Sequence, residues 1–165
     1  PKDAKEAVKW YRKAAEQGNA AAQLNLGAMY ARGDGVLEDD KEAVKWFRKA
    51  AEQDLAKAQL NLGTMYSFGK GVLEDDKEAV KWYRKAAEQG DAEAQSYLGV
   101  MYANGEGVPE DRLTAYAWSN IAAANGSKNA TLNKSNLAKT MTPEDISKAQ
   151  ALSKEMVSKN PKLLK

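Results

Sequence analysis

Basic side chains recur at a fixed spacing in this sequence and are its clearest candidates for binding chemistry. The candidate residues are Lys9, Arg12 and Lys13, their copies Lys45, Arg48 and Lys49, and their copies Lys81, Arg84 and Lys85. Positions i, i+3 and i+4 share one side of a helix, so each triplet would form one rung of a basic ladder. Such a ladder could hold an acidic peptide or another anionic polymer. The alternative is a solvated surface whose cations pair locally with Glu6 and Glu16.

Loop carboxylates and repeated tryptophans suggest two other kinds of site. Asp34, Glu38, Asp39 and Asp40 lack the alternating spacing of a calcium loop, and Asp39 is better explained as a helix cap. Tryptophan occupies the same helical-wheel position in every repeat, which favours a role in the core over ligand binding. We therefore expect no metal ion and no other cofactor.

Catalysis has little support in the residue types present. The sequence contains no histidine and no cysteine, which excludes imidazole bases, thiol nucleophiles and zinc sites built from those ligands. It has no nucleophile elbow, Walker-type loop or dinucleotide fingerprint. The net charge of +2 lacks the basic excess of a nucleic-acid binder, and no apolar run reaches the ~20 residues of a membrane span. We expect a protein that is not an enzyme.

A 36-residue period indicates which elements must position the basic residues. Trp10, Trp46, Trp82 and Trp118 follow this period, as do the glycines that punctuate each repeat. The pattern of the first repeat predicts a helix over residues 4–17, with Asp3 as its N-cap, and a second helix over residues 20–32. Gly18 and Gly33 are the expected left-handed residues after the two helices. Asp54 replaces that first glycine in the second repeat and is expected to keep the left-handed geometry.

Each predicted helix pair exposes an apolar face that only a neighbouring pair can bury. Trp10, Tyr11 and several alanines share one arc of the first helix and are expected to be buried with Tyr30. The first helix also carries a charged stripe of Lys5, Lys9, Arg12 and Glu16, which in the fourth repeat becomes Leu113, Ala117, Asn120 and Ala124. A helix starting at Thr142 and Pro143 is expected to cover that stripe as a C-terminal cap.

The predicted fold is an all-α, right-handed α-solenoid of helix–turn–helix repeats with a C-terminal capping helix. The expected domain divisions are 1–36, 37–72, 73–108, a divergent repeat at 109–140, and the capping helix and tail at 141–165. Phe68 and Tyr97, with Val100, differ from their counterparts in the first repeat and are candidate anchors for a partner. They could equally be incidental apolar surface or be buried against a neighbouring repeat.

The pattern resembles the Sel-1-like repeat family, relatives of the tetratricopeptide repeats. The resemblance rests on Ala7-x2-Trp10-Tyr11-x2-Ala14-Ala15-x2-Gly18, on Ala22-Gln23-x2-Leu26-Gly27-x2-Tyr30 and on Gly33-x-Gly35-Val36, and it covers nearly the whole chain. It implies an adaptor or scaffold whose first helices line the concave side. A bacterial, periplasmic or secreted protein is implied over a cytoplasmic one. Since Pro1 aligns with Leu37 inside an inter-repeat loop, we also expect this chain to be the C-terminal piece of a longer member.

The function expected from these observations is a protein-interaction scaffold that binds a protein or peptide partner on its concave or variable surface. An acidic partner suits the basic ladder. The alternative function is a structural spacer within a longer multi-repeat protein. The sequence indicates neither the oligomeric state nor the identity of the partner.

Overall fold

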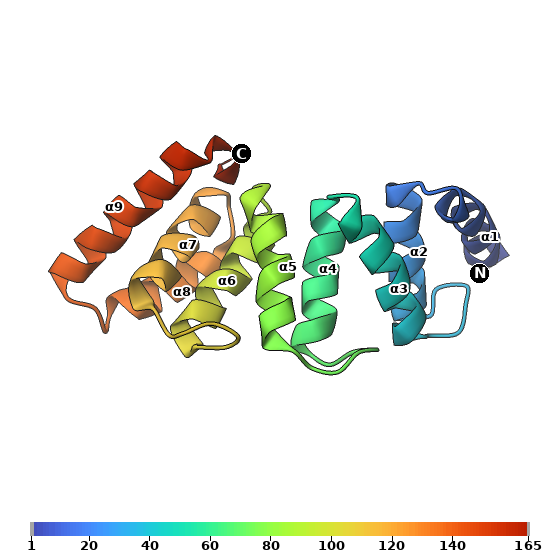
Figure 1. Ribbon diagram of the computed structural model, residues 1–165, viewed down its shortest axis with the longest axis horizontal. Coiled ribbons are helices and arrows are strands. Elements are labelled where there is room, and N and C mark those ends of the chain that lie inside the picture. Colours follow the sequence, from blue (N-terminus) through green and yellow to red (C-terminus); the bar gives the residue numbers. More distant parts are fainter. Residues whose placement is uncertain (1, 165) are drawn as a thin grey trace. The chain divides into compact units, whose positions relative to one another are not determined.

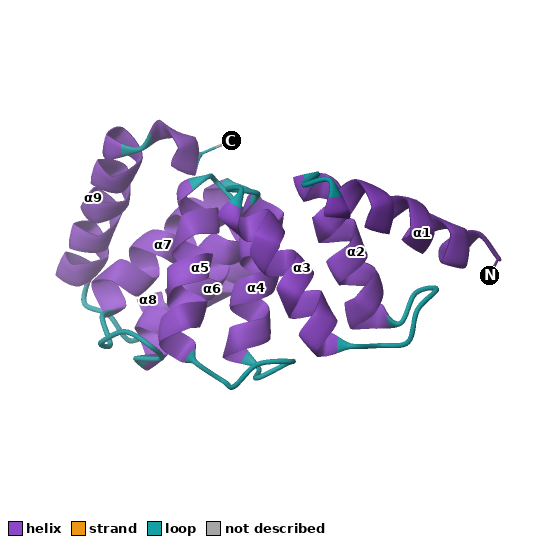
Figure 2. Cartoon of the chain, turned by 45° about the vertical axis from the view of Figure 1, so that its right-hand side comes forward, coloured by secondary structure: helices purple, strands orange, loops and turns teal. Residues whose placement is uncertain are grey.

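The computed structural model describes residues 2–164, and this part of the chain is built from helices joined by short loops (Figures 1 and 2). The α-helices are α1 (Lys2–Glu16), α2 (Ala20–Arg32), α3 (Asp40–Glu52), α4 (Ala56–Ser67), α5 (Asp76–Glu88), α6 (Ala92–Asn104), α7 (Arg112–Ala124), α8 (Lys128–Ala138) and α9 (Pro143–Lys159), followed by the short 3-10 helix η1 (Pro161–Leu163). The predicted fold is confirmed: the chain is an α-solenoid of helix–turn–helix repeats with a C-terminal capping helix.

The chain divides into two compact units, one up to residue 75 and the other from residue 76 onward. In the first unit α1 packs on α2, α2 on α3 and α3 on α4. In the second unit α5 packs on α6, α6 on α7, and α7 on both α8 and α9. Within each unit, the second helix of a repeat (α2 or α6) therefore contacts both its partner in the same repeat and the first helix of the next repeat.

Side-chain caps and left-handed residues set the ends of the helices much as predicted. Asn19 Oδ1 accepts a hydrogen bond from the Ala22 amide at 2.8 Å, and α2 ends at Gly33, whose φ is 68°. Asp39 caps α3 through the Glu42 amide at 3.0 Å. Asp54 has a φ of 60° and keeps the left-handed geometry expected of it.

The prediction of Asp3 as an N-cap is wrong. Asp3 lies inside the first turn of α1, which begins at Lys2. Its counterpart Asp39 is held in an extended conformation because its amide donates to the Tyr30 carbonyl at 3.0 Å. No such bond from Asp3 is present in the described residues, so the helix continues past it.

Within each unit, the first helix of one pair packs on the second helix of the pair before it: α3 packs on α2, and α7 packs on α6. The Phe47 ring lies only 2.8 Å from where a side-chain Cβ would stand on Gly27, so α3 approaches α2 at a residue whose lack of a side chain leaves room for the ring. Trp46 packs against the core of the first repeat, which contains Val8 and Leu26. An aromatic residue of one repeat is thus buried by the repeat that precedes it.

This direction of packing corrects the burial predicted for the first repeat. Trp82 and Trp118 are buried as expected, and Trp46 is partly buried, but Trp10 is 64% exposed and Tyr11 37% exposed. Trp10 and Tyr11 are the counterparts of Trp46 and Phe47, and the described residues contain no earlier helix pair to cover them. Tyr30 is also only partly buried.

The capping helix α9 forms as predicted, with Thr142 as its N-cap and Pro143 in its first turn. It lies along α7, where Ile121 and Ala117 are buried (Figure 1). Ala149 of α9 is fully buried. None of the described helices has both the length and the apolar character needed to cross a membrane.

Candidate functional site

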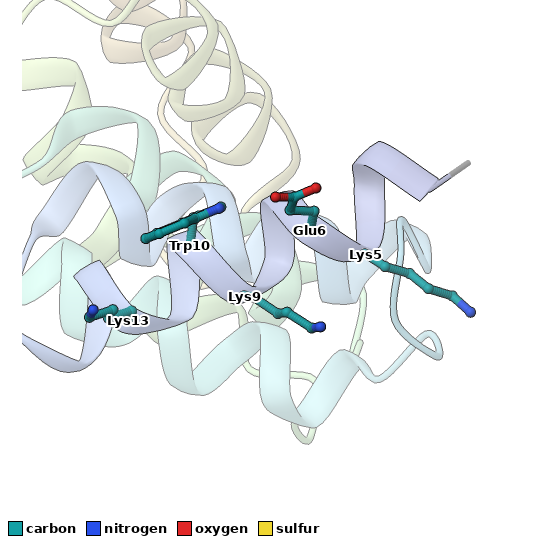
Figure 3. A pocket seen from close by; sticks show the side chains of 5 residues that line it. All are labelled: Lys5, Glu6, Lys9, Trp10 and Lys13. Carbon is teal, nitrogen blue, oxygen red and sulfur yellow. The ribbon is translucent and has the colours of Figure 1, made fainter.

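Two similar hollows mark the surface of α1 and α3 that carries the basic ladder. The hollow on α1 has a volume of about 520 Å³ and is lined by Lys5, Glu6, Lys9, Trp10 and Lys13, all drawn in Figure 3. The hollow on α3 has a volume of about 630 Å³, and its lining includes the exact counterparts Lys41, Glu42, Lys45, Trp46 and Lys49. We call this surface of each first helix its basic face. The predicted ladder residues Lys9, Lys13, Lys45 and Lys49 thus lie around repeated, solvent-facing hollows.

The lysine at the first position of the ladder pairs with a glutamate one turn earlier. Lys45 Nζ forms an ion pair with Glu42, and Lys81 Nζ lies 3.0 Å from Glu78 Oε1. The hydrogen bond to the Glu42 carboxylate, with its negative charge, raises the pKa of Lys45 above its ordinary value of 10.5. The lysine therefore stays charged at neutral pH. This local pairing is the arrangement expected of a solvated surface, and it reduces the charge offered to a partner without removing it.

The arginine of each triplet joins the two helices of its own repeat. The guanidinium of Arg12 donates to the Tyr30 hydroxyl at 2.5 Å, Arg48 donates to Tyr66 at 2.5 Å, and Arg84 donates to Tyr102 at 2.6 Å. Arg12 and Arg48 also lie over the rings of the same tyrosines, at 5.9 Å and 5.6 Å from the ring centroids. The arginines thus have a structural role that the sequence analysis did not identify. The constant separation of 18 residues between arginine and tyrosine was the available signal.

The last lysine of each triplet lies over the tryptophan of the same helix. The ammonium of Lys49 lies 4.4 Å from the centroid of the Trp46 ring, and that of Lys85 lies 4.8 Å from the Trp82 ring. In α1 the corresponding distance between Lys13 and Trp10 is 5.9 Å. Since Trp46 is partly exposed, α3 offers an indole surface edged by ammonium groups.

The third rung differs from the first two in its tryptophan. Lys81, Arg84 and Lys85 on α5 are exposed, but Trp82 is only 5% exposed and its Nε1 is buried without a hydrogen-bond partner. The indole of α5 is therefore unavailable to a ligand. The basic faces of α1 and α3, both in the first unit, are the ones that combine cations with an accessible indole.

The candidate anchors outside the ladder have separate environments. Phe68, the C-cap residue of α4, is 60% exposed. Tyr97 is partly buried and stacks on Tyr83 with ring centroids 4.9 Å apart, so much of its ring already packs inside the second unit. Val100 lines a hollow of about 300 Å³ between α6 and α8. The structure does not bring Phe68 together with the other two residues in one unit.

The loop carboxylates whose contacts are described act as helix caps or pair with a neighbouring arginine. Asp39 and Asp111 cap α3 and α7, and Asp34 pairs with Arg32 at 2.7 Å. Across residues 2–164 no group of three or more acidic side chains is arranged to hold a metal ion. The geometry of the basic faces supports the binding of carboxylate groups through ammonium groups and an indole surface.

A model of the Sel1 repeat matches residues 1–19, 20–55, 56–91 and 92–127 of the chain. Proteins built from this repeat are generally protein-interaction scaffolds, and the fold is typically non-enzymatic. No curated protein shows significant similarity to the chain.

Solved structures of bacterial proteins have the same fold. A protective antigen of uropathogenic Escherichia coli strains has 42% sequence identity and a TM-score of 0.86, over 94% of this chain and 34% of its own. A Sel1 repeat protein from Oxalobacter formigenes has 41% identity and a TM-score of 0.80, over 94% of this chain and 65% of its own. Cysteine-rich protein B of Helicobacter pylori has 27% identity and a TM-score of 0.63, over 79% of this chain and 93% of its own. The chain thus spans about a third of the E. coli antigen.

Proposed function

Because this chain belongs to the Sel1 repeat family, we propose that it is a protein-interaction scaffold whose basic faces on α1 and α3 bind an acidic protein or peptide. The observation that carries this proposal is the recurrence of one hollow, with one set of lining residues, in two successive repeats. A repeated hollow presents the same chemistry at regular intervals, which suits a partner that extends along the repeats.

Charge and exposure favour an acidic partner over an apolar one. Lys45 and Lys49 are exposed beside the partly exposed Trp46. A carboxylate placed between these ammonium groups would exchange the local pairing with Glu42 for a contact with several cations. The indole would contribute apolar contact area next to that charge.

The test is cross-linked capture of the partner from cells of the native host, comparing charge-reversed chains. We expect the combined substitutions Lys45→Glu and Lys49→Glu to abolish capture. The matched control combines Lys128→Glu and Lys139→Glu, which make the same change in net charge at exposed sites of α8 and its end. Capture that survives the reversal on α3 would reject this surface as the binding site.

A second candidate function is a structural spacer, and the arginine contacts favour it. Arg12, Arg48 and Arg84 each donate a hydrogen bond to a tyrosine of their own repeat. This is expected if their only role is to hold the two helices of the repeat together. A spacer should tolerate changes in surface composition but not in length. Deleting one whole repeat should then impair the parent protein, whereas the charge reversal on α3 should have no effect.

A further inference from the structure

The chain already holds one helix and its following segment against a repeat. α9 lies along α7, and Asn120 Nδ2 donates to Ser153 Oγ at 3.0 Å. Beyond α9, Asn160 Nδ2 donates to the backbone carbonyl of Glu88 at 2.9 Å. We call residues 160–164 the tail. Figure 1 shows α9 beside α7 and the end of the chain close to the upper end of α5.

One backbone carbonyl of the tail accepts hydrogen bonds from two side-chain amides. The Leu163 carbonyl accepts from Gln95 Nε2 at 2.9 Å and from Asn125 Nδ2 at 2.6 Å, and Leu163 itself is 3% exposed. Asn125 also donates to Gln95 Oε1 at 2.9 Å, which fixes the two amides relative to each other. The second unit therefore contains a binding site for a helix and the short segment that follows it, which here includes the 3-10 helix η1.

The first unit contains the same amide pair two repeats earlier. Gln53 Nε2 donates to Gln23 Oε1 at 2.8 Å, as Asn125 does to Gln95. Gln23 Nε2 donates to the Ala15 carbonyl at 3.0 Å, as Gln95 does to the Ala87 carbonyl at 3.1 Å. Both pairs of positions differ by twice the 36-residue period, so they are equivalent sites of the repeat.

The amides of Gln23 and Gln53 in the first unit have N–H groups that could donate a further hydrogen bond. A carboxamide carries two N–H groups, and Gln23 Nε2, in a side chain only 4% exposed, has Ala15 O as its one acceptor among the described contacts. The other donation of Gln53 is a long bond of 3.4 Å to the Lys49 carbonyl. Gly18, at the adjoining turn, is exposed with open space around it, whereas its counterpart Gly90 is buried. A peptide carbonyl would satisfy these donors.

A helix that lies on α3, next to Gln23 and Gln53, must differ from α9 in charge. The positions at which α7 has Leu113, Ala117 and Asn120 are occupied in α3 by Lys41, Lys45 and Arg48. These three residues also line the 630 Å³ hollow of the basic face. An α9-like helix on α3 would therefore need carboxylates where α9 presents Ala149 and Ser153 to α7.

We propose that the partner of the first unit is a helix with an acidic face, which lies along α3 as α9 lies along α7, and whose following segment offers a backbone carbonyl to the amides of Gln23 and Gln53. This inference rests on the proposed function and specifies the shape and chemistry of its partner. It places the binding site at the basic face of α3 and the edge formed by the ends of α1, α2 and α3.

The probe is a fluorescein-labelled synthetic peptide with the sequence of residues 143–165, in which Ala149, Ser153 and Val157 are each replaced by glutamate. It is titrated with the full chain and followed by fluorescence anisotropy, and its helicity is followed by circular dichroism. A second acidic peptide ends at Ser158 and lacks the tail. We expect the longer peptide to gain helicity on binding and to bind at least about tenfold more tightly, the gain expected from two additional hydrogen bonds.

Substitutions in the full chain separate the two parts of the site. Lys45→Glu combined with Lys49→Glu should weaken both peptides by about tenfold or more. Gln53→Leu should weaken the longer peptide and leave the shorter one unchanged, because only the longer peptide carries the carbonyl. Gln53 is exposed, and the circular dichroism spectrum of the variant chain alone checks that its fold is kept. Lys128→Glu on α8 is the control and should change neither affinity.

Equal affinities for the two peptides, indifference to Gln53→Leu, or no binding of either peptide would overturn this inference. The inference would also be overturned if the chain associates with itself and this association disappears when the tail is deleted. The site on the first unit would then bind the tail of a second copy of the chain. Host-cell capture distinguishes this failure from that of the proposed function. A native partner that is lost on charge reversal but not with Gln53→Leu leaves the basic face as the site and rejects the helical mode. A native partner indifferent to both rejects the proposed function itself.

Discussion

A Cβ atom at Gly71 would lie 2.3 Å from the Asp40 carbonyl oxygen, and the backbone there has a φ of 68°. The second glycine of the inter-repeat loop thus lets the loop contact the first turn of α3. Gly71→Ala should therefore destabilise the chain by at least about 2 kcal/mol, through left-handed strain of about 1–2 kcal/mol together with a backbone clash. Chemical denaturation measures this loss.

Gly18→Ala is the matched control for that substitution. Gly18 has a φ of 91°, but a Cβ there would meet nothing within 4 Å. Only the left-handed strain of about 1 kcal/mol should be felt. Equal losses in the two variants would contradict the close approach of the loop to α3.

Ser119 presents a buried hydroxyl whose Oγ has no hydrogen-bond partner. It occupies the position of Phe47 in an earlier repeat, and its Oγ lies 2.6 Å from where a Cβ on Gly99 would stand. Ser119→Ala should raise the free energy of unfolding by about 1 kcal/mol, because an unsatisfied buried hydroxyl costs about 1–3 kcal/mol. Ser153→Ala should instead be destabilising, since Ser153 Oγ is bonded to Asn120 and to the Gln150 carbonyl. Thermal unfolding of both variants checks the opposite signs.

Trp10 and Trp46 occupy the same position in successive repeats but differ in burial, so the same substitution can be compared at both. Trp46 packs on the first repeat, so Trp46→Ala should cost about 2 kcal/mol, below the 3–5 kcal/mol typical of a fully buried tryptophan. Trp10→Ala removes a side chain that is 64% exposed and should cost under about 0.5 kcal/mol. Similar losses from both variants in chemical denaturation would mean that Trp10 is covered in solution.

At the scale of the helices, the tail connects the ends of three of them. It contacts the end of α5 through Asn160, and the start of α6 and the end of α7 through the Leu163 carbonyl. Truncation after Lys159 should destabilise the second unit by about 3 kcal/mol, from one buried leucine and the lost hydrogen bonds. Hydrogen exchange should then accelerate in α5–α7 and stay unchanged in α1–α3. Acceleration spread evenly over both units would contradict a local role of the tail.

Local sequence signals were sufficient for the elements themselves. The helix spans, the left-handed Asp54, the Thr142 cap and the covering of α7 all follow from patterns that lie within one repeat or one helix. The contact between Gln95 and Leu163 joins residues 68 positions apart and has no periodic signal. The tail was therefore outside the reach of the sequence analysis.

At the scale of the molecule, burial in a repeat protein depends on neighbours as well as on the residue. Trp10 and Trp82 share a wheel position, yet one is exposed and the other buried. A period alone assigns both to the core, because it describes an interior repeat. The candidate site has a similar history. The spacing of the sequence indicates its lysines and arginines, but it does not indicate which tyrosines and tryptophans they contact.

The central claim is that the basic face of α3 is where a partner binds, and lysine footprinting in an extract of the native host tests it most directly. The chain is acetylated in the presence and absence of extract, and each lysine is quantified by mass spectrometry. We predict that Lys41, Lys45 and Lys49 are protected by the extract while Lys128 and Lys148 react as in buffer. Unchanged reactivity on α3, with protection confined to the lysines of α8 and α9, would contradict the claim.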